Sequence, residues 1–262
     1  MTANVALRKS SLAVESVLFA GRLLTHWRRD PVMAMQAILY PTFLLIAYDL
    51  LVGKSILKIT GRESIYGLVP TCAIAGAMFG ALTASLAIRV DLHWGLLPRL
   101  WVLPVNRASA LTGRLVAEAV RTLVGSVIVT AVGVVLGLRF EGGLLAVIPF
   151  ILVPVAVAVV FSTVLIAIAV RSTSNMALML VGVVSVTAVF ASSGAPPVET
   201  LPSWARLPVQ FQPMYPTVQL MRALAEGGPT LLPLLVSLIW ALTLVAVFGP
   251  LAMSGYRKAA GR

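Results

Sequence analysis

The chain has 262 residues, of which 59% are hydrophobic and only 11% are charged, and its mean hydropathy is +0.98. This composition excludes an ordinary soluble domain, and the continuously apolar runs exclude a transmembrane β-barrel, whose strands alternate apolar and polar residues. The net charge of +11 is explained by basic loops on the cytoplasmic side of a membrane protein, so we expect no nucleic-acid partner. The single cysteine, Cys72, leaves no internal disulfide and no Cys/His metal cluster. The sequence therefore predicts an all-α polytopic membrane protein.

Residues 1–31 form the first predicted unit, a cytoplasmic N-terminal segment. Its apolar stretch from Leu12 to Phe19 is interrupted by Glu15 and has no clean cleavage site after it, so it is not interpreted as a signal peptide. As a helix, the segment has a basic polar side that consists of Ser11, Glu15, Arg22, His26 and Arg29. This modest amphipathic pattern predicts an interfacial elbow helix in the membrane plane.

Residues 32–262 form the second predicted unit, a single membrane domain. Because a bilayer core needs about 20 apolar residues per helix, the apolar runs predict six spans at about 32–53, 66–90, 111–137, 144–170, 176–195 and 230–253. With the N-terminus inside, thirteen of the 20 basic residues lie on inner segments and six on outer ones, while Arg121 lies within the third span. The excess of basic residues on the inner segments predicts that both termini face the cytoplasm.

The segment "LPRLWVLPVNRASAL", residues 97–111, separates the second and third predicted spans and faces the cytoplasm in this topology. It carries apolar side chains and two arginines around two prolines: Leu97, Pro98, Arg99, Leu100, Trp101, Leu103, Pro104 and Arg107. Apolar anchors that include a tryptophan suit a contact with a protein partner, and the prolines would bound a short helix. Tryptophan and arginine are also common in loops that face lipid headgroups, so the residues alone leave both interpretations open.

Arg114, Glu118 and Arg121 follow i, i+4 and i+7 spacing at the inner start of the third span. This spacing lets them pair along one helix face. Because charges within a span are costly, they form either an interfacial ion cluster or a gate or site for a substrate headgroup. No chain of acidic residues crosses the middle of the spans, which disfavours a proton- or sodium-coupled transporter.

The sequence offers no convergent set of reactive groups of the kind that an enzyme needs. Both histidines, His26 and His93, lie in segments assigned to the cytoplasm, so neither can activate a serine within a span. The chain also has no G-x-x-x-x-G-K-[ST] motif and therefore no P-loop of its own. We expect no catalytic residue, no metal and no directly bound cofactor.

The stretch between the fifth and sixth predicted spans, residues 196–229, is predicted to lie outside and to hold two short helices. The first is expected around Pro202 to Leu207, and the second has Thr217 as its N-cap and Gly227 as its C-terminal stop. The apolar side of the second helix would consist of Leu220, Met221 and Leu224. Such helices would lie in the outer leaflet against protein, and an ordinary ordered loop is the alternative.

The order of these features resembles the membrane subunit of ABC-2 type transporters, in particular the daunorubicin-resistance-type permeases of actinobacteria. The inner loop is similar to the family's R-x-x-x-L-P-v-x-R segment at Arg99, Leu103, Pro104 and Arg107. The outer stretch is similar to a second family signature at Leu201, Pro202, Trp204, Pro213, Arg222, Ala223, Leu224 and Gly228. The resemblance covers essentially the whole chain.

The resemblance implies the permease subunit of an ATP-driven exporter. ATP and Mg²⁺ would bind to a separate cytosolic ATPase subunit, present in two copies, and a second permease, expected to be a distinct paralogue, would complete the complex. The inner loop would be the coupling helix that contacts the ATPase. The implied substrates are lipids, such as phthiocerol dimycocerosate-like lipids, or hydrophobic drugs, exported from the cytoplasmic membrane. A membrane scaffold or binding protein and a secondary transporter are the alternatives from other classes.

Overall fold

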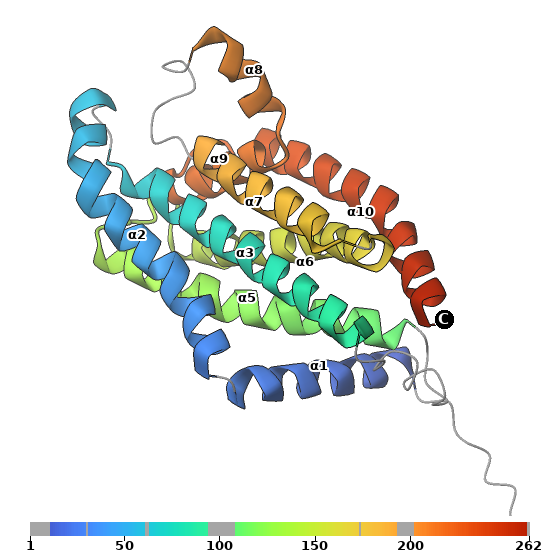
Figure 1. The fold of residues 1–262 in the computed structure, drawn as a ribbon. Coiled ribbons are helices and arrows are strands. Elements are labelled where there is room, and N and C mark those ends of the chain that lie inside the picture. The colour runs from blue at the N-terminus through green and yellow to red at the C-terminus, as the bar shows by residue number, and fades with distance from the viewer. Residues whose placement is uncertain are drawn as a thin grey trace, which may run out of the picture.

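The computed structural model describes residues 11–29, 31–60, 63–93, 108–172, 174–192 and 202–260. Within these ranges the chain is helical and has no β-strand (Figure 1). The helices are α1 (Leu12–Arg29), α2 (Pro31–Thr60), α3 (Ile65–His93), α5 (Ser109–Val135), η1 (Leu144–Ala146), α6 (Val147–Arg171), α7 (Asn175–Ser192), α8 (Ser203–Phe211), α9 (Met214–Glu226) and α10 (Leu231–Ala260). The predicted all-α fold class is therefore confirmed.

Six long helices, α2, α3, α5, α6, α7 and α10, occupy the six stretches predicted to be spans. Four segments among the described residues are long and apolar enough to cross a membrane: Ile65–Val90, Ser109–Val135, Leu144–Arg171 and Leu231–Gly255. The apolar parts of α2 and α7, Leu39–Leu51 and Asn175–Phe190, are shorter. A polytopic membrane protein follows from these helices, whereas the number of six spans stays a prediction.

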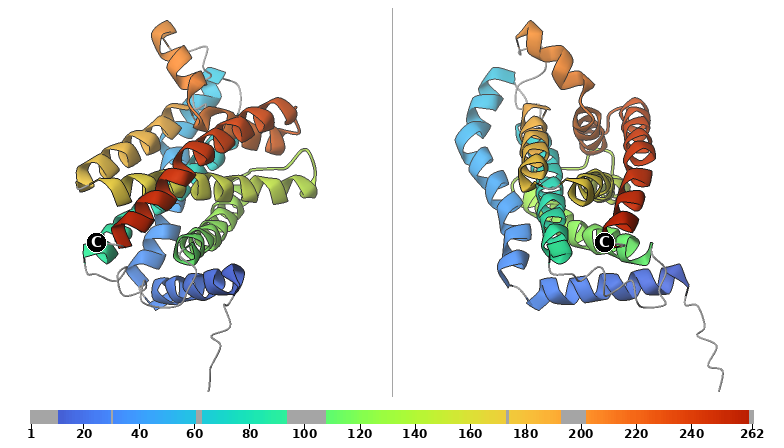
Figure 2. Two further views of the ribbon diagram at one scale, coloured as in Figure 1. Left: turned by 90° about the vertical axis from the view of Figure 1, so that its right-hand side faces the viewer. Right: turned by 45° about the vertical axis from the view of Figure 1, so that its right-hand side comes forward.

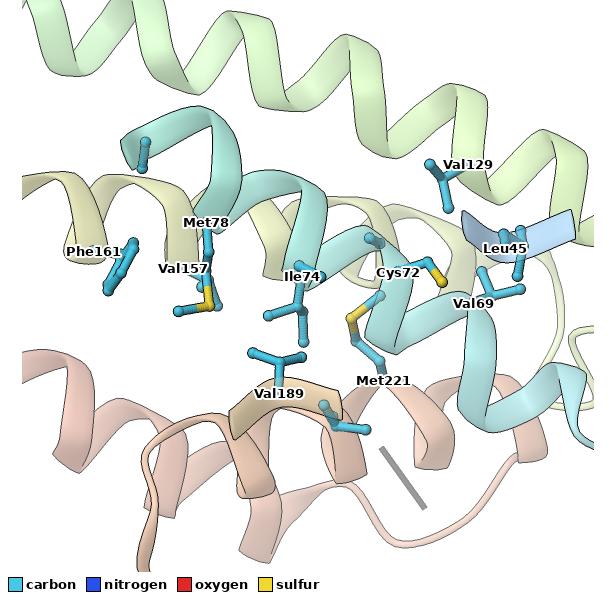
Figure 3. Packing of buried hydrophobic residues seen from close by; sticks show 14 of the residues in the cluster. Leu45, Val69, Cys72, Ile74, Met78, Val129, Val157, Phe161, Val189 and Met221 are labelled. Atoms are coloured by element: carbon cyan, nitrogen blue, oxygen red, sulfur yellow. The ribbon is translucent and has the colours of Figure 1, made fainter. Parts of the chain in front are cut away.

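Helix α3 forms the centre of the bundle and packs against α2, α5, α6, α7 and α9. Its side chains Val69, Cys72, Ile74 and Met78 are fully buried, and Figure 3 shows them among residues contributed by the surrounding helices. Small residues allow this close packing. A Cβ at Gly76 would lie 2.7 Å from the Cβ of Pro41 in α2, so α2 and α3 meet at that point without room for a side chain.

The bundle has two distinct ends. Helix α1 lies across one end, transverse to α2, and the C-terminal end of α10 lies near it, whereas α8 lies at the opposite end (Figures 1 and 2). At the α1 end, Arg89 of α3 donates to the carbonyl oxygens of Ser172 and, at 3.4 Å, of Ala169 in α6. At the other end, the backbone N–H of Glu141 donates to the carbonyl oxygen of Ala225 in α9 at 2.9 Å. Segments assigned to one side of the membrane by charge therefore lie together.

Candidate functional site

The predicted coupling segment lies between α3 and α5. Its candidate residues, Leu97, Arg99, Leu100, Trp101, Leu103, Pro104 and Arg107, are outside the described residues. The structure describes the flanking residues, because α3 ends at His93 and α5 begins at Ser109. Their role in coupling stays a prediction.

Helix α1 is held against the first turns of α5. The hydroxyl groups of Ser16 and Thr112 share a hydrogen bond. Gly113 allows the close approach, since a Cβ there would lie 2.6 Å from the Cβ of Phe19 and 2.7 Å from the carbonyl oxygen of Ser16. These contacts pack α1 directly against the start of the third predicted span, so the N-terminal segment and the membrane domain form one folded unit.

The amphipathic pattern of α1 is oriented differently from the prediction in one respect. Glu15 was predicted to belong to the basic polar side of the helix, but its side chain is buried, together with Ser16 and Ala20, on the side that contacts α5. The apolar Val17 and Leu18 are instead 64% and 68% exposed. The exposed apolar residues make this side of α1 suitable for contact with lipid. The small and polar residues on the other side of α1 pack against α5.

The predicted charge cluster on α5 contains an ion pair between two of its three members. Arg121 donates from Nε to Oε2 of Glu118 at 3.0 Å and from Nη2 to Oε1 of the same carboxylate. Arg114, one turn earlier, donates to the carbonyl oxygen of Ala84 in α3 at 3.2 Å. Because the Glu118 side chain is only 5% exposed, the ion pair lies within the protein and is shielded from solvent.

These three charged residues line a cavity of about 370 Å³ between α1, α2, α3 and α5. Its other walls include Trp27 of α1, the ring pair Tyr40 and Phe79 of α2 and α3, whose centroids are 4.6 Å apart, and a series of small residues on α3. The small residues are Gly76, Gly80, Thr83, Ala84 and Ala87. A volume in this range is typical of small-molecule sites, and mostly apolar walls with a few convergent polar groups are characteristic of them.

The charged residues of this cavity were recognisable from the sequence, whereas the residues that form its other walls were not predicted. Gly76, Gly80, Thr83 and Ala87 recur every three or four residues, which is the spacing of one helix face. This spacing was the feature of the sequence from which the α3 wall of the cavity could have been predicted. The contributions of Trp27 and Tyr40 depend on how α1 and α2 fold back on α5, which no local pattern specifies.

At the α1 end of the bundle, a second arginine besides Arg89 links neighbouring helices. Arg171, the last residue of α6, donates from Nη2 to Oγ of Ser254 at 2.8 Å and from Nε to the carbonyl oxygen of Leu251 at 3.3 Å. Arg89 and Arg171 both belong to the basic residues whose distribution predicts the orientation of the chain. Between them they also donate hydrogen bonds to backbone and side-chain oxygens of neighbouring helices. Such bonds join the helices of the domain at this end.

The outer signature residues lie in and around α8 and α9. Pro202 and Pro213 are the residues that precede the two helices, and Trp204 is 78% exposed. Arg222 pairs with Glu226 at 3.7 Å within α9, and the N–H of Gly228 donates to the carbonyl oxygen of Ala223 at 2.9 Å. These residues form two adjoining helices rather than one convergent site.

Of the two predicted limits of α9, the C-terminal one is correct and the N-terminal one is wrong. Gly227 ends the helix with φ of 69°, as expected for a left-handed C-terminal residue. Thr217 is not the N-cap: the helix begins at Met214, and the Thr217 hydroxyl donates to the carbonyl oxygen of Pro213 at 3.1 Å. Proline is tolerated in a first helical turn because no N–H is needed there, so Pro216 does not delay the helix. The predicted apolar side is buried at Leu220 and Met221, and Leu224 is half-buried.

Residues 16–225 match the ABC-2 type transporter family. The chain therefore belongs to this family and is a multi-pass ABC transporter permease. The match includes most of α1, the residues that line the charged cavity and most of α9.

Curated relatives agree with this family over most of the chain. The "Probable doxorubicin resistance ABC transporter permease protein DrrC" of Mycobacterium tuberculosis is 34% identical over 94% of this chain and 89% of its own length. The "Daunorubicin resistance ABC transporter permease protein DrrB1" of Streptomyces coeruleorubidus is 24% identical over 90% of this chain and 84% of its own length. The "Putative transport permease ycf38" of Cyanophora paradoxa is 24% identical over 80% of this chain.

Proposed function

We propose that the chain is the permease subunit of an exporter that moves a lipid or a hydrophobic drug out of the cytoplasmic membrane. The observation that carries this proposal is the family match across residues 16–225. Relatives named for doxorubicin and daunorubicin resistance support an amphipathic or hydrophobic substrate. A phthiocerol dimycocerosate-like lipid is the second substrate class in this proposal.

In this proposal the energy comes from a separate cytosolic ATPase, present in two copies, which holds ATP and Mg²⁺. The segment with Trp101 and Arg107 docks on the ATPase and transmits its motion to α3 and α5, the helices that flank it. The position of His93 and Ser109 supports this role, since α3 ends and α5 begins at the α1 end of the bundle (Figure 1). A second permease, expected to be a distinct paralogue, completes the pathway.

We further propose that both termini face the cytoplasm and that the α1 end is the cytoplasmic end. The excess of basic residues on the inner segments supports this orientation. Helix α1 then lies at the inner membrane surface, packed against α5.

Co-purification tests this proposal. The full chain, tagged at one terminus and extracted from its native membrane in mild detergent, is expected to retain an ATP-binding subunit in a one-to-one ratio with total permease subunits. The Arg107→Glu variant is expected to reach the membrane in normal amount and to lose that subunit. A chain that never retains an ATPase under conditions that preserve other membrane complexes would overturn the proposal.

A further inference from the structure

The cavity beside α1 is enclosed mainly by aromatic and small side chains. Trp27 of α1 contributes an indole ring, and Tyr40 and Phe79 contribute a stacked pair of rings. The rest of the wall along α3 consists of glycine, alanine and one threonine, so a bound molecule can approach that helix closely. Aromatic side chains interact favourably with another ring that stacks on them or meets them edge to face. The walls therefore favour a ligand with a planar aromatic body.

The charged residues of the wall are engaged within the protein. Arg121 donates from Nε and Nη2 to the carboxylate of Glu118, and Arg114 donates to the carbonyl oxygen of Ala84 at 3.2 Å. A charged ligand would give up its hydration and would have to compete with these internal partners. An uncharged ligand loses far less hydration and leaves both interactions in place. The wall therefore favours an uncharged ligand over an anionic or a cationic one.

One hydrogen-bond donor of the wall residues has no acceptor. Nε1 of Trp27 is buried and has no hydrogen-bond partner among the described residues, although a buried indole N–H usually finds one. A buried donor that stays unpaired is costly to the protein. An oxygen that enters with a ligand can accept this hydrogen bond, whereas a hydrocarbon cannot. The unpaired donor therefore favours a ligand that carries an acceptor oxygen.

The cavity is also open to the surface of the chain. Thr83 of α3 and His26 of α1 both line it, and both are exposed. Its volume of about 370 Å³ lies in the range of sites for small molecules. A ligand can therefore enter the cavity without separation of α1 from α5.

We propose that this cavity binds an uncharged, planar aromatic molecule that carries a carbonyl-type oxygen. The aromatic body lies among the rings of Trp27, Tyr40 and Phe79 and against the small residues of α3. The oxygen accepts a hydrogen bond from Nε1 of Trp27. A hydrocarbon of the same shape fills the same space but leaves this donor unpaired, so it binds more weakly.

The test is equilibrium dialysis of the purified full chain with radiolabelled fluorenone and fluorene, at equal detergent concentration on both sides of the dialysis membrane. Both probes are uncharged, planar and of the same size, and only fluorenone has a carbonyl oxygen. We expect saturable binding of both, with fluorenone about threefold to tenfold tighter. Trp27→Phe keeps an aromatic ring but removes the N–H, so the preference for fluorenone over fluorene should disappear.

Two further variants test the location of the site. Ala87→Leu places a larger side chain on the cavity wall and should weaken the binding of both probes about tenfold or more. Ala246→Leu makes the same change at an exposed position of α10, outside the cavity, and should leave both affinities unchanged. The anion fluorene carboxylate tests the preference for an uncharged ligand and is expected to bind more weakly than fluorenone.

Several outcomes would each overturn the proposal. These are the absence of saturable binding, equal affinities for fluorenone and fluorene, a preference that survives Trp27→Phe, equal effects of the two leucine variants, and tighter binding of the carboxylate. The measurement needs neither an ATPase nor transport. A negative result would therefore leave the proposed permease function in place, and a chain that retains no ATPase would leave this site in place.

Discussion

The guanidinium group of Arg121 occupies the space that a Cβ at Gly80 would take, so that any side chain at position 80 would overlap it. This contact joins α5 to α3 and holds Arg121 where it pairs with Glu118. A glycine in the middle of a membrane helix therefore determines where a charged side chain of the next helix lies.

Replacement of Gly80 by alanine should displace Arg121 and weaken its pair with Glu118. Alanine favours helix formation over glycine, and the guanidinium is the far end of a flexible side chain that can shift. The expected cost therefore comes from the disturbed buried ion pair and amounts to a net loss of about 1 kcal/mol. We expect a lower thermal unfolding midpoint in detergent. Gly249→Ala in α10 is the matched control, because a Cβ there would meet only Val245 at 3.8 Å, and an equal decrease in both variants would contradict this explanation.

The contact between α1 and α5 should depend on Gly113. A Cβ at this position would press on the backbone carbonyl of Ser16, which cannot move away as a flexible side chain can. Gly113→Ala should therefore loosen α1 and increase amide hydrogen exchange across residues 12–29, with little effect in α10. Gly21→Ala is the control, since position 21 of α1 has open space around it. Unchanged exchange in α1 of the Gly113 variant would show that the packing there is not limiting.

The end of α9 should depend on the left-handed conformation of Gly227. Its φ is 69°, and a Cβ would lie 3.3 Å from the backbone nitrogen of Gly142. Gly227→Ala should destabilise the chain by about 1 kcal/mol or more, seen as a lower unfolding midpoint. Gly228→Ala changes the next residue, where a Cβ would have only ordinary contacts with Ala223. It should have a smaller effect, and the reverse order would contradict the assignment.

The coupling segment should be needed for transport but not for membrane insertion. Trp101→Ala and Arg107→Glu remove a proposed anchor and reverse a proposed contact charge, so each should leave the chain in the membrane and uncouple transport from ATP hydrolysis. The measurement compares hydrolysis and export in the same membranes. Arg139→Glu is the control, because Arg139 is exposed on the connection between α5 and η1 and should tolerate charge reversal. Normal transport in both coupling variants would refute the role of this segment.

Much of the fold follows from the sequence because membrane helices are specified by long apolar runs. The predicted stretch 66–90 corresponds to α3 and the stretch 111–137 to α5, with limits that differ by a few residues. Gly227 was predictable because a glycine after a periodic apolar pattern favours a left-handed helix end. The prediction of Thr217 as the N-cap was wrong because α9 begins three residues earlier, at Met214, and Pro216 fits within its first turn.

The site was less predictable because it depends on contacts between helices distant in the sequence. The spacing of Glu118 and Arg121 predicted their pairing, but not that Arg114 would donate to Ala84 of α3. The burial of Glu15 likewise results from the docking of α1 on α5, which the amphipathic pattern of α1 alone does not encode.

The central claim is that this permease belongs to an exporter driven by ATP. It is tested most directly by substrate movement in sealed vesicles that contain the chain with its co-purified ATPase, with ion gradients collapsed by ionophores. For an ATP-driven exporter we expect movement that requires hydrolysable ATP, is unaffected by the ionophores and is lost in Arg107→Glu. Movement that follows an ion gradient and proceeds without ATP would contradict it.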